Sequence, residues 1–243
     1  MTAVANLVQL RMLEDLDGFL LVDKPAGIAY STVVKTVKRK FNLVKVGHGG
    51  SLDTSASGLL VLLVNDANKF VGDVMGADRV HSAVMRLGLR TDTHDMHGRR
   101  LGDCGEAAMP SREEFDRALG GFKGDIFQTE PRFCSVRREG AAQYEVADTG
   151  EHSQFMSHVY RFGISQFAPP KVAFEVFGTK TLLVRTLVND IGDALGCGAC
   201  LESLRRTRIG KFSVEEAIPF ERLLATETGD FASCVMPLSV ALR

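Results

Sequence analysis

The sequence has few cysteines, and their spacing does not suit a disulfide framework. The chain of 243 residues contains five, an odd and scattered set that fits a reducing compartment. Cys197 and Cys200 have C-x-x-C spacing, but no second cysteine or histidine pair stands at the spacing of a zinc site. We therefore interpret Cys197 as a small buried residue near a helix end, and we expect no bound metal.

The sequence also lacks a long apolar run. No stretch reaches the roughly 18 residues that a membrane-spanning helix needs, so we expect no membrane partner. Residues 1–17 show neither a signal-peptide cleavage pattern nor an arginine- and serine-rich amphipathic pattern. The cytoplasm and the mitochondrial matrix both remain open as compartments.

Net positive charge is absent as well. The formal net charge is −1 and the isoelectric point is about 6.6, so a nucleic acid would have to bind at a local basic patch. One candidate is the polar face of an expected helix, where a solvated surface is the simpler interpretation. A second is a basic stretch near the C-terminus. The two candidate groups are Lys35, Lys38, Arg39 and Lys40, and Arg205, Arg206, Arg208 and Lys211.

The patterning predicts an α+β protein with a mixed, mostly antiparallel sheet flanked by helices. Apolar residues make up 45% and charged residues 24% of the chain, which is ordinary for a globular protein. Ser31 is expected to cap a helix that ends near Phe41, and Ser111 with Glu114 forms a capping-box pattern. Loops are expected at 88–110 and, irregularly, at 120–155. Strands are expected at 18–25, 58–64, 80–87, 171–176 and 180–184, and further helices at 186–195, ending at Gly196, and 214–224.

The most informative segment runs from Gly47 to Leu60 and reads GHGGSLDTSASGLL. Its glycines allow tight turns and close approach to a ligand. Asp53 lies between this loop and the expected strand at 58–64, so its carboxylate could be held beside a cleft and act as a nucleophile. A loop aspartate that only caps a turn is the alternative.

This segment resembles the motif G-H-x-G-x-L-D-P-x-A-x-G-L-L of the TruB-type RNA pseudouridine synthases, with Thr54 in place of the proline. Residues 18–27 are similar to the family's G-x-x-x-x-D-K-P-x-G, and residues 37–39 to its basic helix. Residues 87–98 resemble its L-G-x-x-T-D-T-x-D-x-x-G. Residues 184–206 are similar to its C-terminal catalytic-domain motif. The ordered motifs cover roughly residues 18–225 and imply the pseudouridine synthase fold with a central catalytic cleft.

The resemblance implies that a uridine is flipped out of its RNA and isomerised without a metal or organic cofactor. By position in the motifs, Asp53 is the nucleophile and Arg185 its expected ion-pair partner. His81 takes the place of a tyrosine that stacks on the base and transfers protons. The remaining matched positions are expected to contact RNA or line the cleft: Lys24, Lys38, Arg39, His48, Gly49, Ser51, Leu183, Leu204 and Arg205.

Two departures leave a second hypothesis open. The family's two active-site tyrosines are replaced by His81 and Leu183. A histidine can stack and exchange protons, whereas leucine can only pack. Asp148 also stands where an arginine is common. The alternative is therefore a catalytically inactive relative that binds RNA as a ribosome or organelle RNA assembly factor.

The resemblance also suggests a domain plan and partners. We expect an extension at 1–17, a catalytic domain at 18–225 with an RNA-contacting insertion at about 120–160, and a tail at 226–243. Bacterial relatives often carry a further C-terminal RNA-binding module, for which the tail leaves no room. A partner protein or a ribosomal assembly particle is then expected to present the substrate, either tRNA or rRNA.

The loop at 92–97 is a further candidate for cation binding because it contains Asp92, His94, Asp95 and His97. The spacing of an EF-hand is absent. We therefore predict a loop held by its own hydrogen bonds.

Overall fold

The computed structural model describes residues 16–103, 109–129 and 154–241. Most of the expected insertion lies outside these residues, including Asp148, as do Cys104, Cys134 and nearly all of the expected extension at 1–17. Two compact units are present: residues 1–77 with 205–243, and residues 78–204. No helix in the described ranges is long and apolar enough to span a membrane.

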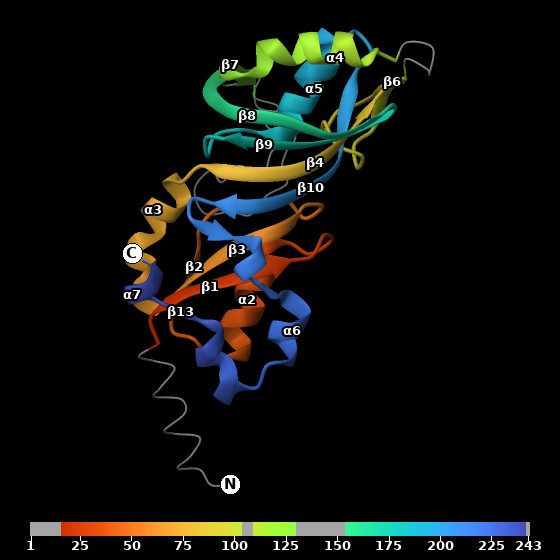
Figure 1. The fold of residues 1–243 in the computed structure, drawn as a ribbon. Coiled ribbons are helices and arrows are strands. Elements are labelled where there is room, and N and C mark those ends of the chain that lie inside the picture. The colour runs from red at the N-terminus through yellow and green to blue at the C-terminus, as the bar shows by residue number, and fades with distance from the viewer. Residues whose placement is uncertain (1–15, 104–108, 130–153, 242–243) are drawn as a thin grey trace, which may run out of the picture. The chain divides into compact units, whose positions relative to one another are not determined.

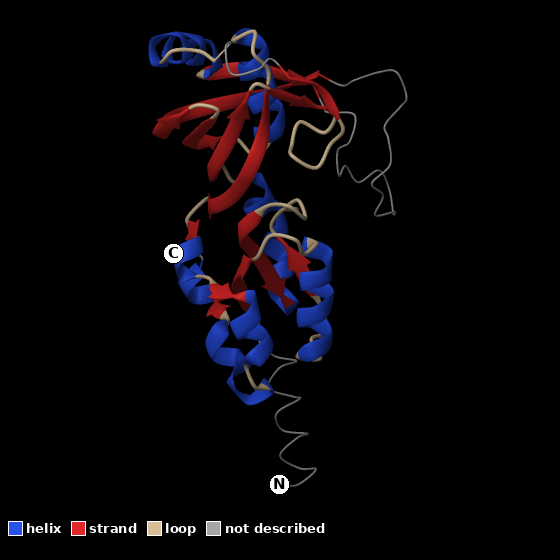
Figure 2. Ribbon diagram, turned by 90° about the vertical axis from the view of Figure 1, so that its right-hand side faces the viewer, coloured by secondary structure: helices blue, strands red, loops and turns tan. Residues whose placement is uncertain are grey.

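The first unit is built on β1 (Gly18–Lys24) and β3 (Ser57–Val64), which pair antiparallel from Gly18 opposite Val64 to Lys24 opposite Gly58. Helices α2 (Tyr30–Lys40) and α6 (Phe220–Ala225) lie against these strands (Figure 1). Figure 2 distinguishes helices, strands and loops by colour. β2 pairs with β3, and the last residues of β10 run parallel to β3. The other elements of this unit are β2 (Val46–His48), η1 (Asn65–Phe70), α3 (Val71–Gly76), β11 (Phe212–Ser213), η4 (Val214–Glu216), β12 (Ile218–Pro219), η5 (Thr228–Cys234), β13 (Met236–Pro237) and α7 (Leu238–Ala241).

The continuous apolar run of β3 is buried on both faces, as its pattern predicted. Leu60 and Leu62 pack with α2 and α6 on one face, whereas Leu59 and Val61 pack with α3 and the start of β11 on the other. Residues 226–241, for which we expected a tail, contribute η5, β13 and α7, and β13 pairs with β1. This packing holds the loop that carries Asp53 on a rigid base.

The second unit contains an antiparallel sheet in the order β4-β9-β8-β7. Helices α4 and α5 pack on it through Phe115, Leu187 and Ile191 (Figure 1). The capping box of Ser111 and Glu114 is confirmed at the start of α4. Strand β10 (Ala199–Ile209) begins in this unit and ends in the first. The elements that lie wholly in this unit have the bounds β4 (Arg79–Leu87), β5 (Leu89–Thr91), β6 (Arg100–Asp103), α4 (Arg112–Leu119), η3 (Gly120–Phe122), β7 (Gly124–Thr129), β8 (Gln154–Ala168), β9 (Lys171–Gly178) and α5 (Val184–Ala194).

Several expected elements differ from the structure. Helix α2 begins at Tyr30 with Ala29 at its N-cap, so Ser31 lies inside the first turn. The expected loop at 88–110 contains the hairpin β5–β6, and 180–184 is not a strand because α5 already begins at Val184. The expected helix at 214–224 is broken by Pro219, which has no N–H to continue a helix and stands at the N-cap of α6.

Candidate active site

Asp53 lies in a short loop between β2 and β3, and buried neighbours fix it from both sides. Leu52 is 6% exposed and Ala56 is 1% exposed, whereas Asp53 itself is half-buried. The N–H of Ala56 donates to the carbonyl oxygen of Asp53 at 3.1 Å, which closes a tight turn. The loop is therefore anchored in the core while the carboxylate stays within reach of solvent.

Lys24 ties this loop to the chain that follows β1. Its side chain is fully buried, and Nζ donates to the carbonyl oxygens of Pro25 and Ile28, both at 2.8 Å, and of Thr54 at 3.5 Å. The N–H of Gly27 donates to the same Thr54 oxygen at 2.7 Å. The residue next to Asp53 is thus held from two directions.

The pKa of Lys24 is lowered to about 8, mainly by burial and in addition by the positive charge of Arg206. The negative charge of Asp53 acts in the opposite direction and raises this pKa. The ammonium is therefore largely retained at neutral pH. Lys24 thereby places a positive charge close enough to Asp53 for the two to interact.

His48, Gly49 and Ser51 surround the start of the loop. His48 Nδ1 accepts from the N–H of Gly50 at 3.3 Å, and its ring lies 4.9 Å from that of Tyr30. The N–H of Gly49 donates to Val61, and a Cβ on Gly49 would lie 2.2 Å from a methyl group of Val74. Gly49 is therefore required for close packing, while Ser51 is exposed.

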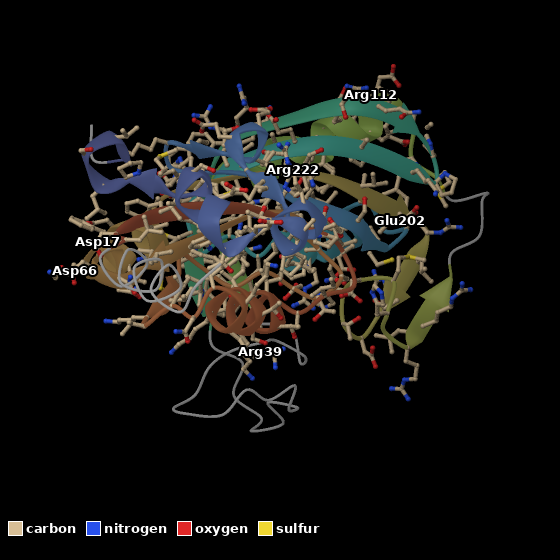
Figure 3. All side chains as sticks on the ribbon, turned by 90° about the horizontal axis from the view of Figure 1, so that it is seen from below. Asp17, Arg39, Asp66, Arg112, Glu202 and Arg222 are labelled. Carbon is tan, nitrogen blue, oxygen red and sulfur yellow. The ribbon has the colours of Figure 1, made fainter. Side chains whose placement is uncertain are left out.

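The basic residues differ in what they contact. Lys38 and Arg39 are exposed on α2, as expected for a surface patch (Arg39 is labelled in Figure 3). Arg205 donates from Nη1 and Nη2 to the two carboxylate oxygens of Asp23, at 2.9 and 2.7 Å. Arg206 is only 2% exposed. Its assignment to a surface patch is therefore wrong, because its guanidinium is bound to backbone carbonyls inside the first unit.

In the second unit, Arg185 in the first turn of α5 is held by the loop at 91–98. Its Nη1 donates to the carbonyl oxygen of Thr93 at 3.2 Å and lies 3.6 Å from Oδ2 of Asp95. The other oxygen of Asp95 accepts from the hydroxyl of Thr93 at 2.7 Å and the N–H of His97 at 2.9 Å. The prediction that the loop at 92–97 is held by its own hydrogen bonds is therefore confirmed.

His94 in this loop has a positive φ of 61°. Burial lowers its pKa, and the charge of Arg185 lowers it further. The described residues contain no group of three or more His, Cys, Asp or Glu side chains that could hold a metal ion.

Three other expected site residues also belong to the second unit. His81 lies on β4 and is 6% exposed, opposite Val176 of β9. Leu204 is half-buried against the core of this unit. Leu183 is the N-cap of α5, and Gln128 holds both of its backbone groups. The amide of Gln128 donates to the carbonyl of Leu183 and accepts from its N–H, both at 3.0 Å.

The first unit therefore brings Lys24, His48, Gly49, Ser51, Asp53 and Arg205 into one neighbourhood, and the second contains His81, Leu183, Arg185 and Leu204. The expected ion pair between Asp53 and Arg185 joins different units and stays a prediction. The contacts of Arg206 and Gln128 with backbone groups were not predicted from the sequence. Each is a single polar residue whose partners are backbone groups distant in sequence, which leaves no local pattern.

Comparison with known proteins gives two family matches. The TruB family pseudouridylate synthase N-terminal domain matches residues 38–182. The tRNA pseudouridylate synthase B C-terminal domain matches residues 185–243. The second match includes residues 226–243, for which the sequence suggested a tail.

Curated relatives named tRNA pseudouridine synthase B agree with these matches. The protein from Burkholderia pseudomallei is 38% identical over 234 residues, covering 93% of this chain and 76% of its own. The one from Pseudomonas aeruginosa is 35% identical over 216 residues, covering 88% and 70%.

A solved structure described as a Cbf5-Nop10-Gar1 complex superposes with a TM-score of 0.69 and 26% identity, over 96% of this chain. This chain spans 63% of that relative's length. The H/ACA RNP bound to a substrate RNA containing 2′-deoxyuridine matches with a TM-score of 0.66 at 24% identity, which supports the fold alone.

Proposed function

Since the chain belongs to the TruB family of pseudouridylate synthases, we propose that it isomerises a uridine in tRNA and that Asp53 is the nucleophile. The observation that carries this proposal is the Asp53 loop, in which the carboxylate is half-buried while its neighbours Leu52 and Ala56 are buried. A nucleophile needs this combination of fixed geometry and access.

The proposed reaction begins with extrusion of the target uridine from the RNA, because its reacting atoms are inaccessible while it is stacked. Asp53 assists cleavage of the bond between C1′ and N1. The released uracil turns, and C5 forms the new bond to C1′. The proton on C5 is then lost and N1 regains one, so the step is an isomerisation that consumes no oxidant, reductant or cofactor.

In this proposal, the positive charge of Arg185 acts on Asp53, and the negative charge of Asp95 positions Arg185. Arg185 would pair with the Asp53 carboxylate and orient it. Asp95 and the Thr93 carbonyl hold the guanidinium within the second unit. His81 would stack on the flipped base and exchange the proton at C5. Lys38 and Arg39 would contact the phosphate backbone.

A second candidate function rests on one specific observation. By the resemblance of the motifs, His81 and Leu183 stand where the family has tyrosines, and leucine cannot donate a hydrogen bond. A chain with this change could bind RNA without isomerising it and act in the assembly of a ribosome or an organelle RNA. The two functions predict opposite results for a substitution at Asp53.

The experiment maps pseudouridines by mass spectrometry in cellular RNA. A strain lacking the protein is complemented with the wild type, with Asp53→Asn, or with an empty vector. Loss of one specific pseudouridine, restored by the wild type alone, is the expected result and also identifies the RNA. An unchanged map, together with full rescue of growth by Asp53→Asn, would contradict catalysis and support the RNA-binding function.

A further inference from the structure

Arg206 is a fully engaged buried cation beside the Asp53 loop. Its Nε donates to the carbonyl oxygen of Leu59 at 2.9 Å, and Nη1 donates to that of Ser51 at 2.8 Å. Nη2 donates to the carbonyl oxygen of Gly50 at 3.2 Å. Because Gly50 and Ser51 precede Asp53 and Leu59 follows it, a single guanidinium joins both ends of the loop.

The position of Arg206 is fixed by close backbone packing. β10 runs parallel to β3, with Arg206 opposite Gly58. Gly58 has a φ of 104°, and a Cβ there would lie 2.3 Å from the carbonyl oxygen of Arg206. Only glycine allows the two strands to approach this closely. The backbone of Arg206 therefore has little freedom to move, and its planar fork of donors reaches the loop in a fixed orientation.

Lys24 holds the middle of the same loop through the carbonyl oxygen of Thr54. The carbonyls that flank Asp53 are thus bound by two buried cations, from β1 and from β10. The two cations repel each other, since Arg206 contributes to the lowered pKa of Lys24. An arrangement that places like charges together under burial is costly, and the three carbonyls bound by Arg206, two in the loop and one in β3, offset part of this cost.

We infer that Arg206 is a positioning residue for the proposed reaction, which fixes the backbone on both sides of Asp53 and thereby aims its carboxylate. This inference rests on the proposed function of Asp53. Arg206 is buried and its three donor nitrogens are bound to carbonyls, so it acts on the rate of the chemical step and does not bind RNA. The preceding residue, Arg205, differs because its side chain is 40% exposed and pairs with the Asp23 carboxylate.

The test compares Arg206→Lys with the wild type in single-turnover pseudouridine formation on a tRNA transcript. Lysine keeps the charge but cannot reach three carbonyls in a fixed fork. We expect the maximal rate constant to fall about 100-fold, as for a small displacement of a reacting group, and the half-saturating RNA concentration to stay unchanged. The control Arg222→Lys, exposed on α6 in the same unit (Figure 3), should change neither value.

A wild-type rate in folded Arg206→Lys would overturn the inference. So would a raised half-saturating concentration with an unchanged rate constant, which would make Arg206 an RNA ligand. If the variant does not fold, hydrogen exchange of the wild-type backbone amides at 50–56 tests whether the Asp53 loop is held rigidly. Exchange as slow as that of the β3 amides would support a loop fixed by Arg206, and exchange as fast as that of an exposed loop would overturn the inference. A wild-type protein that forms no pseudouridine would refute the proposed function. The exchange measurement would still test whether Arg206 fixes the Asp53 loop, because it does not depend on activity.

Discussion

The carboxylate of Asp95 lies 3.6 Å from Nη1 of Arg185, and both side chains are nearly buried, at 12% and 14% exposed. Asp95 is itself fixed by the hydroxyl of Thr93 and the N–H of His97. The arginine proposed to pair with Asp53 is therefore positioned by a second carboxylate within its own unit. Partly buried charges held in this way keep their orientation better than solvated ones.

Replacing Asp95 tests this relationship. Asp95→Asn keeps an oxygen for the Thr93 hydroxyl but removes the charge that faces Arg185. We expect the single-turnover rate constant to fall by about 10- to 100-fold, with thermal stability lowered only slightly. The control Asp92→Asn changes a carboxylate of the same loop, whose Oδ1 accepts from the N–H of Arg99 instead. Equal rates for the Asp95 variant and the wild type would show that Asp95 does not position Arg185.

Gln128 supports the start of α5 through its two hydrogen bonds to Leu183. Gln128 is 1% exposed, so Gln128→Ala would remove the acceptor of the Leu183 N–H and one of two donors to its carbonyl, which the N–H of Leu187 also reaches at 2.9 Å. We expect the free energy of unfolding in urea to fall by about 2–3 kcal/mol. Gln166→Ala, at an exposed position on β8, should change it by less than about 0.5 kcal/mol. Similar small losses in both variants would contradict the assigned role.

His81 is proposed to stand at the position of a family tyrosine that stacks on the base. His81→Phe keeps a ring for stacking but cannot exchange a proton. If His81 transfers the proton at C5, the rate constant should fall about 100-fold while RNA affinity stays the same. His81→Tyr restores the family's residue and should retain activity. Full activity in the phenylalanine variant would remove His81 from the proton transfer.

Lys24 should make stability depend on pH. Its pKa falls from 10.5 in the unfolded chain to about 8 in the folded protein. Between these values the unfolded chain binds a proton that the folded protein does not, so the free energy of unfolding rises with pH in this window, by up to about 3 kcal/mol. This gain is lost again as the pH falls toward 8.

Urea unfolding between about pH 7 and 10 tests this behaviour. The difference in stability between the wild type and Lys24→Met should shift in favour of the wild type as the pH rises. Lys180→Met, at an exposed position, should give a difference that does not change with pH. A constant difference for the Lys24 variant as well would place its titration outside this range.

The parts of the fold that the sequence predicted correctly have local causes. The apolar run of β3 indicates burial on both faces, Ser111 and Glu114 cap a helix within four residues, and Gly196 adopts the positive φ that ends α5. The loop before β3 was also predicted from its glycines, and the catalytic role of Asp53 stays a prediction. In each case the physical reason lies within a few neighbouring positions.

The missed features depend on pairing between distant segments. Strand β8 was not predicted because its buried and exposed residues do not alternate regularly, and register shifts interrupt its pairing with β9. Arg206 was assigned to a surface patch because a basic stretch looks the same whether it is solvated or bound to carbonyls. Its burial follows from the pairing of β10 with β3, about 150 residues away in sequence.

The most direct test of the account measures release of tritium from C5 of uridine in a labelled tRNA transcript by the purified protein. The wild type should release one equivalent from a single site, and Asp53→Asn should release none while binding the transcript with unchanged affinity. This result would establish that the Asp53 carboxylate carries out the isomerisation. Equal release by the wild type and Asp53→Asn would contradict the central claim.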